Sequence, residues 1–218
     1  MTKTRILLVD DHPLVREWLT NLINQQPGMV VCGEAEDAPQ ALSAIETTQP
    51  HLAVIDISLK GGSGIELIKD LKQLHPRLLI LVLSMHDELL YAERALRAGA
   101  RSYIMKREVT KKIITAIREV LAGNLYLSDR VSALIANKFV DGQPTANESP
   151  VTLLSDRELE VFQLLGQGRE TKQIAESLHI SLKTVQAYCA RIKEKLDLTN
   201  ATELLREAIR WEEDRQRL

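Results

Sequence analysis

Five short runs of apolar, largely β-branched residues recur through the first half of the chain, and they constrain its fold more than any other feature. No charged residue interrupts them, so each run is expected to be a strand that helices cover on both faces. The runs are Ile6 to Val9, Met29 to Cys32, Leu52 to Ile55, Leu78 to Leu83 and Ser102 to Met105.

Helical patterns separate these runs, and their ends carry recognisable signals. Pro13 stands at a first helical turn, where a missing N–H is tolerated. Asp37 can cap the next helix, and Thr110 can cap a helix that ends at Gly123. Strand and helix therefore alternate, and right-handed crossovers between them predict a doubly wound α/β domain with a five-stranded parallel sheet over residues 1–124.

Charged residues directly follow three of the runs. Asp10 and Asp11 follow the first, Asp56 the third and Lys106 the fifth. The carboxyl ends of parallel strands meet at one edge of a sheet, so these side chains are expected to converge although they are far apart in sequence. Taken singly, Asp10 is equally well explained as a turn residue and Lys106 as a solvated strand end. Together they predict a small acidic pocket with one cation beside it.

Length and composition agree with two packed domains, because 218 residues exceed one average domain and 44% of them are hydrophobic. Cys32 and Cys189 fall in apolar patterns, which indicates reduced packing residues, and no Cys/His cluster has metal-ligand spacing. No stretch is long enough to cross a bilayer, and the start Met-Thr-Lys-Thr-Arg is charged too soon for a secretory signal. We therefore expect a cytoplasmic protein that does not enter a membrane.

Residues 125–150 are predicted to be a linker. Ser128 can cap a short amphipathic helix from Asp129 to Phe139. The sequence Asp-Gly-Gln-Pro-Thr-Ala-Asn-Glu-Ser-Pro then supplies turn formers with almost nothing to bury, which predicts a flexible segment from Val140 to Pro150.

The rest of the chain carries only helical patterns. Ser155 and Glu158 match a capping box, in which each side chain accepts a hydrogen bond from an N–H group at the helix start. A short helix from Thr171 to Leu178, a longer one from Ser181 to Leu196 and a last one from Thr202 to Trp211 are expected to follow. Two helices joined by a tight turn, the second of them amphipathic, are typical of a helix-turn-helix that places one helix in a DNA major groove.

The helix from Ser181 to Leu196 divides into an apolar stripe and a polar face. After residue 150 the chain has 11 Lys and Arg against 12 Asp and Glu, so the overall charge of this domain does not indicate DNA binding. The helix itself carries four cations and one anion, and at a Debye length of about 8 Å this local charge governs a phosphate nearby. A merely solvated polar face is the simpler alternative. The candidate DNA contacts, including one on the preceding helix, are Lys172, Lys183, Thr184, Gln186, Ala187, Ala190 and Arg191.

Two sets of motifs occur in a consistent order along the chain. The first half contains Ile-Leu-Leu-Val-Asp-Asp-His-Pro at 6–13, Val-Ile-Asp-Ile-Ser-Leu at 54–59, Leu-Ser at 83–84 and Tyr-Ile-Met-Lys-Arg at 103–107. The second contains Leu-Ser-Asp-Arg-Glu-Leu-Glu-Val at 154–161, Lys-Gln-Ile-Ala at 172–175 and Ser-Leu-Lys-Thr-Val at 181–185. On these motifs nearly the whole chain resembles a bacterial two-component response regulator of the NarL/FixJ subfamily, with a receiver domain at 1–124 and a LuxR-type helix-turn-helix domain at 151–218.

The resemblance implies a role for several residues of the acidic pocket. Asp56 resembles the carboxylate that accepts a phosphoryl group, Ser84 the hydroxyl that bonds the new phosphoryl oxygen, and Lys106 the cation that pairs with it. Tyr103 resembles the aromatic residue that swings inward after Ser84 moves. For Ser84 and Tyr103, a loop hydroxyl and a partly buried aromatic residue are the alternative explanations.

The resemblance also implies a magnesium site. Asp11 and Asp56, the backbone carbonyl of Ser58, and Asp10 through a water molecule correspond to the Mg²⁺ ligands of the family. This agrees with the chemistry of the residues, because three neighbouring carboxylates repel one another unless a hard divalent cation lies between them.

The implied function is that of a transcription regulator rather than an enzyme. A sensor histidine kinase would phosphorylate Asp56, and the output domain would bind double-stranded DNA as a dimer, with Gln186, Ala187 and Ala190 facing base edges and the other candidates holding phosphates. A DNA-binding regulator whose receiver acts without phosphorylation is the alternative. An enzyme that turns over an aspartyl phosphate is less favoured, because such hydrolases place two aspartates two residues apart after the first strand, whereas Asp10 and Asp11 are adjacent.

The chain departs from the family pattern at three places, one of which is Asn200-Ala201-Thr202-Glu203, where Asn-Arg is common. Leu59-Lys60-Gly61-Gly62 stands where receivers often have a Met-Pro sequence before a glycine-rich turn, so a looser loop is expected there. Tyr188 stands where the subfamily commonly has histidine, which leaves its role at DNA open. The five histidines share no spacing, and none is assigned a catalytic role.

Overall fold

The structure is a computed structural model that describes residues 3–140 and 150–216. Its contacts divide the chain into two compact units, Met1–Gly142 and Gln143–Leu218. Of the predicted flexible segment, residues 141–149 lie outside the described residues. The domain limits at 124 and 151 therefore stay predictions.

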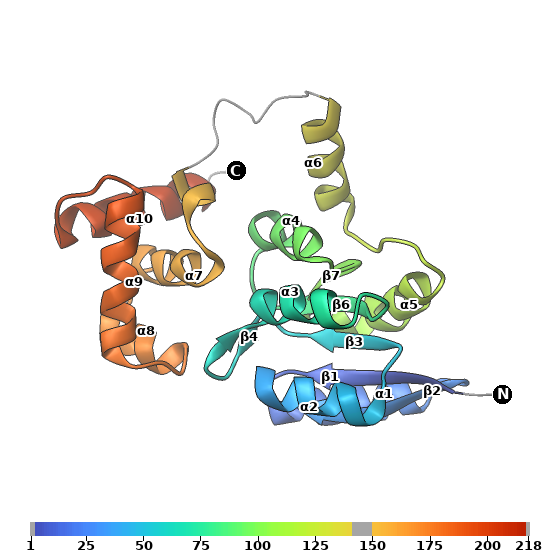
Figure 1. The fold of residues 1–218 in the computed structure, drawn as a ribbon. Helices are drawn as coiled ribbons and strands as arrows, with labels where there is room; N and C mark the ends of the chain where they lie inside the picture. Colours follow the sequence, from blue (N-terminus) through green and yellow to red (C-terminus); the bar gives the residue numbers. More distant parts are fainter. Residues whose placement is uncertain (1–2, 141–149, 217–218) are drawn as a thin grey trace. The chain divides into compact units, whose positions relative to one another are not determined.

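Five parallel strands form the sheet of the first unit: β1 (Thr4–Val9), β2 (Met29–Ala35), β3 (Leu52–Ile55), β6 (Leu79–Ser84) and β7 (Ser102–Met105). Their order in the sheet is β2-β1-β3-β6-β7 (Figure 1). Every predicted run forms one of these strands, and two have the predicted limits. The doubly wound α/β fold is therefore confirmed.

Helices cover both faces of this sheet, as the crossovers require. The helices α1 (Pro13–Asn24) and α5 (Val109–Leu121) enclose a core with one face of the strands. The helices α2 (Ala38–Thr48), α3 (Gly64–Leu74) and α4 (Glu88–Ala98) lie on the other face (Figure 1). All four residues of β3 are buried, which is why so short a strand has no polar side chain.

Two of the predicted helix starts are confirmed and one is wrong. Pro13 opens α1, and the Asp37 carboxylate accepts a hydrogen bond from the Gln40 N–H at 2.9 Å at the start of α2. Thr110 does not cap α5. The chain leaves β7 through a 3₁₀ turn, η1 (Lys106–Glu108), and is already helical at Glu108, so Thr110 lies inside the first turn.

The loop at 59–62, which was expected to be loose, is a paired hairpin. Its strands β4 (Ser58–Leu59) and β5 (Gly62–Ser63) are antiparallel. Gly61 has a φ of 69°, a left-handed conformation that glycine adopts without a steric penalty, and it closes the turn. Leu59 anchors the hairpin because its side chain is buried.

The helix α6 (Asp129–Val140) follows Ser128, whose hydroxyl accepts a hydrogen bond from the Val131 N–H at 3.2 Å. This confirms the helix predicted in the linker. It packs on α4, where Lys138 forms an ion pair with Glu93. Among the helices of residues 3–140 and 150–216, none combines the length and apolarity needed to span a bilayer.

The second unit is helical, as predicted. Its elements are the 3₁₀ turn η2 (Pro150–Leu153) and the helices α7 (Asp156–Gly166), α8 (Thr171–Ser177), α9 (Leu182–Lys195) and α10 (Ala201–Gln216). The last helix continues beyond the predicted end at Trp211, since its inner side packs on α7.

The predicted capping box begins α7 and also binds α9. The Glu158 carboxylate accepts from the Ser155 N–H at 2.7 Å, and the Ser155 hydroxyl accepts from the Glu158 N–H at 3.4 Å. Lys195 of α9 donates to the same Glu158 oxygen at 2.7 Å. Burial alone would raise the pKa of Glu158, but the hydrogen bonds from Lys195 and Ser155 outweigh it and lower this pKa.

We predict that Glu158→Gln destabilises the helical unit by about 1 kcal/mol at pH 7, because the amide keeps the cap but loses the charge that pairs with Lys195. A carboxylate with a lowered pKa stabilises the folded state above its unfolded pKa of about 4.3, and this contribution disappears as the pH falls through the folded-state value. The difference in unfolding free energy between the variant and the parent protein is therefore expected to shrink at about pH 3.5, which is roughly one unit below the unfolded-state pKa.

Urea unfolding followed by Trp211 fluorescence, in a Trp18→Phe background, measures this difference, because the Trp211 ring lies 5.6 Å from Phe162 inside the helical unit. Glu207→Gln is the matched control, since its contact with Arg210 is 3.9 Å long and exposed. A destabilisation that is independent of pH would contradict the assigned ion pair.

Candidate functional site

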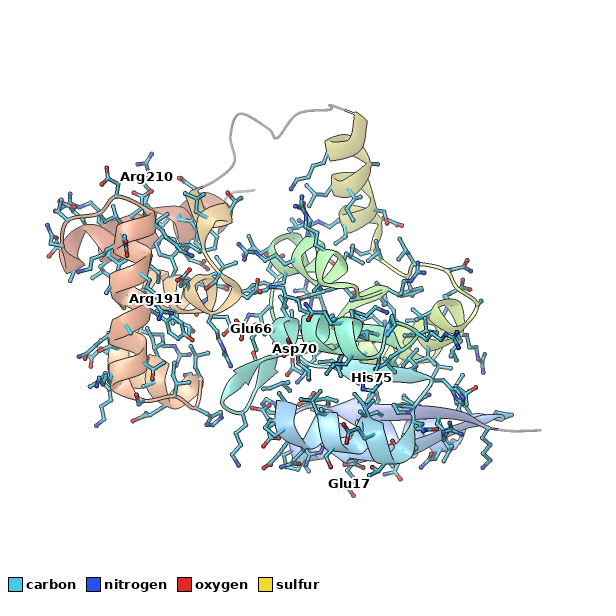
Figure 2. The ribbon with its side chains drawn as sticks, in the orientation of Figure 1. Glu17, Glu66, Asp70, His75, Arg191 and Arg210 are labelled. Carbon is cyan, nitrogen blue, oxygen red and sulfur yellow. The ribbon has the colours of Figure 1, made fainter. Side chains whose placement is uncertain are left out.

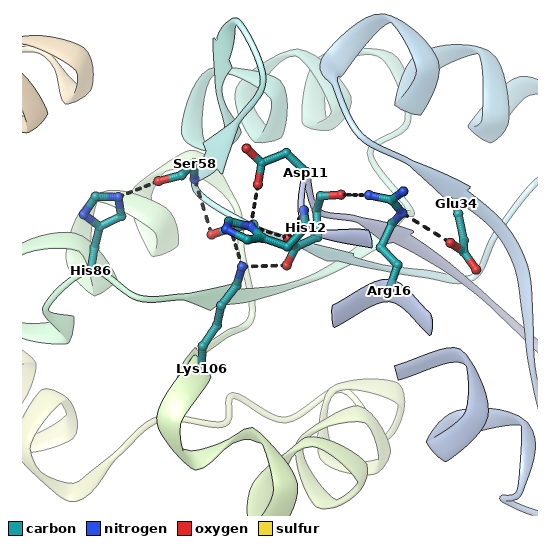
Figure 3. A network of polar contacts seen from close by, with 9 residues as sticks. Asp11, His12, Arg16, Glu34, Ser58, His86 and Lys106 are labelled. Carbon is teal, nitrogen blue, oxygen red and sulfur yellow. Dashed lines mark hydrogen bonds and ion pairs between the residues drawn. The ribbon is translucent and has the colours of Figure 1, made fainter. Parts of the chain in front are cut away.

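The ends of β1, β3 and β7 bring the predicted charged residues together. Lys106 Nζ lies 2.7 Å from an oxygen of Asp10 and 2.7 Å from an oxygen of Asp56 (Figure 3). The register explains this meeting, because Val9 pairs with Ile55 and the Asp56 N–H donates to the Val9 carbonyl at 2.8 Å. Both aspartates therefore leave the sheet at the same edge.

Burial makes the pKa values of Asp56 and Lys106 depend strongly on the charges beside them. The exposed fraction of the side chain is 4% for Asp10, 3% for Asp56 and 9% for Lys106. Burial raises the pKa of Asp56 to about 6, Lys106 acts against this rise, and the charge of Asp10 adds to it. Burial also disfavours the charged form of Lys106, but the two carboxylates outweigh it and raise the pKa of this ammonium group.

The acidic side chains offer a set of oxygen ligands. One ligand atom from each of Asp10, Asp11, His12 and Asp56 lies within 4.8 Å of the other three. Three carboxylates with one ammonium leave a net negative charge, and oxygen ligands of this kind suit Mg²⁺. The donor set therefore fits the predicted ion. His12 was not predicted here, and its ring Nδ1 lies 2.6 Å from Asp11 Oδ1 and 3.2 Å from Asp10 Oδ1.

A second histidine joins the polar residues of the β6–α4 loop. The His86 N–H donates to the Ser84 hydroxyl at 3.1 Å, and the Tyr103 hydroxyl donates to the His86 carbonyl at 2.9 Å. The His86 ring is 2.7 Å from the Ser58 hydroxyl (Figure 3). Ser84 and Tyr103 are both buried, so Tyr103 is in the inward position. The sequence did not predict a role for His86. Its position two residues after Ser84 was the only signal that it belongs to this site.

The loop after Asp56 is fixed by short-range contacts. The Ser58 N–H donates to an Asp56 carboxylate oxygen at 3.3 Å, and the Gly64 N–H donates to the Ile57 carbonyl at 2.7 Å. Gly64 lies so close that an added Cβ atom would be 1.9 Å from the Asp56 backbone oxygen. This close approach explains why a glycine begins α3.

In the helical unit, α8 and α9 form the predicted helix-turn-helix pair, with Ile174, Val185 and Ile192 buried on the inner side. Six of the seven candidate DNA contacts are exposed, whereas Thr184 is half-buried and shares a hydrogen bond of 2.8 Å with the Ser181 hydroxyl. The exposed candidates are Lys172, Lys183, Gln186, Ala187, Ala190 and Arg191.

The polar side of α9 has two further features. Lys195, counted among the cations of this helix, forms the ion pair with Glu158. The Arg191 guanidinium lies 6.0 Å from the centre of the Tyr188 ring on the same helix, and Figure 2 labels Arg191 there. Tyr188 thus contacts a candidate DNA-binding cation, which sequence analysis did not predict.

Known protein families match each half of the chain. The family described as "Response regulator receiver domain" matches residues 6–118, and that described as "Bacterial regulatory proteins, luxR family" matches residues 152–208. The oxygen regulatory protein NreC of Staphylococcus carnosus (strain TM300) is 34% identical over 210 residues, which are 94% of this chain and 97% of NreC.

Solved structures give the same result. RcsB from Salmonella enterica serovar Typhimurium, bound to promoter rprA in the presence of phosphomimetic BeF3-, is 25% identical with a TM-score of 0.62, over 95% of this chain and 98% of RcsB. A LuxR-family two-component response regulator from Aurantimonas sp. SI85-9A1 is 37% identical with a TM-score of 0.59, over 64% of this chain and 99% of that one.

We predict that Gly64→Ala destabilises the first unit by about 3 kcal/mol, because the added methyl group would overlap the Asp56 carbonyl and force the loop to move. Gly62→Ala is the matched control, since a Cβ atom there meets nothing within 4 Å. Urea unfolding followed by Trp18 fluorescence in a Trp211→Phe background measures both. Equal stability of the two variants would refute the close approach.

Proposed function

Because the chain belongs to the two-component response regulators, we propose that a sensor histidine kinase phosphorylates Asp56 and that the helical unit then binds DNA as a dimer. Regulators of this kind, in which a receiver domain precedes a luxR-family DNA-binding domain, control transcription in response to phosphorylation. The observation that carries this proposal is the position of Lys106, 2.7 Å from both Asp10 and Asp56 at the carboxyl edge of the sheet. Such an arrangement holds a nucleophilic carboxylate beside a cation that can pair with a transferred phosphoryl group.

The proposed reaction is a phosphoryl transfer to a carboxylate. An Asp56 oxygen attacks phosphorus, the bond from phosphorus to the ring nitrogen of the kinase phosphohistidine breaks, and the leaving imidazole takes up a proton. The nucleophile must be ionised, and Lys106 opposes the burial that raises its pKa. After transfer, the ammonium group of Lys106 can donate to a phosphoryl oxygen while it keeps Asp10.

A bound Mg²⁺ would supply positive charge to the phosphoryl oxygens in this step. Its proposed ligands are Asp11, Asp56 and the backbone carbonyl of Ser58, with Asp10 acting through water. The crowding of carboxylates at the site supports this assignment, since a divalent cation relieves their repulsion.

The proposed switch starts at Ser84. In the structure the His86 N–H donates to the Ser84 hydroxyl. When this hydroxyl turns to a phosphoryl oxygen, the His86 N–H loses its hydrogen-bond acceptor. The His86 carbonyl also accepts from the Tyr103 hydroxyl, and the His86 ring contacts Ser58. A shift of this loop therefore affects Ser84, Tyr103 and Ser58, which surround the phosphoryl-accepting Asp56. Phosphorylation thus acts on α4, which begins after this loop with Asp87 as its N-cap.

DNA binding is proposed for the exposed side of α9. Gln186, Ala187 and Ala190 are assigned to base edges, and Lys183 and Arg191, with Lys172 of α8, to phosphates. Thr184 is better placed to support the helix start than to reach far outward, because it bonds Ser181. One small domain makes few phosphate contacts, so two copies on neighbouring half-sites are expected.

We predict that incubation with Mg²⁺ and a small phosphoryl donor gives a stable adduct on Asp56, located by mass spectrometry, and that Asp56→Asn abolishes it. Asp70→Asn is the control, because Asp70 is an exposed carboxylate on α3 (Figure 2). Continuous phosphate release without an adduct would indicate an enzyme instead. Absence of any adduct would favour a receiver that acts without phosphorylation.

We predict that Lys183→Ala weakens binding to all DNA sequences and reduces the slope of log K against log salt by about 1, because one phosphate contact is lost. Gln186→Ala should instead change the sequence preference and leave the salt slope unchanged. Arg210→Ala removes an equal charge from the exposed side of α10 and is the control (Figure 2). Titrations of a pool of DNA sites at several salt concentrations test these assignments, and unaltered binding in both α9 variants would refute them.

A further inference from the structure

We propose that Arg16 is a positioning residue for the metal site, because its guanidinium group fixes the peptide plane that joins Asp10 to Asp11. The inference rests on the proposed function in one respect, namely that the two aspartates serve a divalent cation. Arg16 itself touches neither the candidate ligand atoms nor the acceptor. It acts through the backbone that carries them.

The position of Asp10 at the end of the sheet creates the need for such a residue. Strand pairing on both sides of β1 stops at Val9, which is paired with Ala35 on one side and with Ile55 on the other. The Asp10 N–H still donates to the Ala35 carbonyl at 3.0 Å. The Asp10 carbonyl belongs to the next peptide unit, beyond the last paired residues, so the sheet does not determine its direction.

Arg16, in the first turn of α1, supplies a hydrogen-bond donor for this carbonyl. Its Nη1 donates to the Asp10 carbonyl at 2.5 Å, and its Nε donates to Glu34 Oε2 at 3.2 Å (Figure 3). The other oxygen of Glu34 accepts from the Thr20 hydroxyl at 2.8 Å. Glu34 is part of β2, so the guanidinium group links the end of β1, α1 and β2 in a fixed geometry.

The consequence for the metal site follows from the planarity of the peptide bond. The carbonyl of Asp10 and the N–H of Asp11 lie in one plane, and rotation of that plane moves the Asp11 Cα atom and its carboxylate. A donor that holds the carbonyl thereby also orients Asp11. The Asp11 carboxylate lies among the clustered ligand atoms, so this orientation determines whether it can share an ion with Asp56.

If Arg16 acted only through its charge, its removal would change the affinity for metal in the opposite direction from a loss of positioning, which makes the inference testable. Arg16 is a cation close to a site for Mg²⁺, so removing its charge should tighten metal binding if electrostatics were its only contribution. Glu34 already neutralises much of that charge. If Arg16 acts by positioning, its loss weakens metal binding, as the loss of hydrogen-bonding partners around metal ligands generally does.

Lysine at position 16 separates geometry from charge. A lysine keeps the charge but has no planar fork with which to hold Asp10 and Glu34 together. We therefore expect Arg16→Lys and Arg16→Met both to raise the Kd for Mg²⁺ by about tenfold or more, measured by isothermal titration calorimetry on the full chain. In phosphorylation assays the half-saturating Mg²⁺ concentration should rise in parallel, and the rate at saturating Mg²⁺ should return to within about twofold of the parent rate, a recovery that a catalytic role would not allow.

The matched control is Arg5→Lys. Arg5 also donates from its guanidinium group to a backbone carbonyl, that of Gln49, at 3.1 and 2.8 Å, but from the start of β1. Its substitution should lower the unfolding temperature in EDTA about as much as Arg16→Lys and leave the Kd for Mg²⁺ unchanged. Equal effects of Arg5→Lys and Arg16→Lys on Mg²⁺ binding would show general destabilisation and would overturn the inference.

A second variant keeps the test decisive if the Arg16 variants do not fold. Glu34→Gln loses the charge that anchors the guanidinium group, and Glu17→Gln removes the same charge from the exposed side of α1 (Figure 2). Glu34→Gln should raise the Kd for Mg²⁺ above that of Glu17→Gln.

The outcomes separate this inference from the proposed function. Equal Kd values for the Glu34 and Glu17 variants, or Arg16 variants that bind Mg²⁺ as tightly as the parent protein, would overturn the inference. If instead Asp56 accepts no phosphoryl group while the Arg16 variants lose Mg²⁺ affinity, the inference stands and the proposed function fails.

Discussion

The contact of Lys106 with Asp10 and Asp56 is the interaction on which the site depends. Three strand ends must meet for it to form, and each of its three side chains is almost fully buried. Burial of a charge is unfavourable unless the charge is paired, so the cluster is stable only as a unit. The two carboxylates keep Lys106 protonated, and Lys106 favours the ionised form of Asp56 that a nucleophile requires.

The residues around this contact divide into those proposed to react and those that hold them in place. Arg16 fixes the backbone of the aspartate pair, Gly64 allows the loop after Asp56 to pass close to α3, and His86 links Ser84, Ser58 and Tyr103. None of these supporting residues lies in the sheet. They come from the first turns of helices and from loops, so the rigid strands set where the site is and the surrounding turns set its fine geometry.

In the helical unit, too, one charged side chain supports more than one element. Glu158 completes the cap of α7 and pairs with Lys195 of α9, so one carboxylate fixes both a helix start and the helix assigned to DNA. This ion pair neutralises one of the four cations of α9. The other three cations of α9 are Lys183, Lys193 and Arg191, the last of which lies over Tyr188.

The order of residues along the chain was enough to predict the strands, most helix starts and the edge at which Asp10, Asp56 and Lys106 meet, because alternation of buried runs with helices permits one kind of sheet and parallel strands share one carboxyl edge. It failed where the outcome depends on neighbours distant in the chain. The 3₁₀ turn that displaced the Thr110 cap, the hairpin at 58–63, and the contacts of Arg16 and His86 arise from packing between elements. These features follow from the three-dimensional arrangement of the elements, since a side chain that reaches a backbone carbonyl on another element leaves no periodic signal in the sequence.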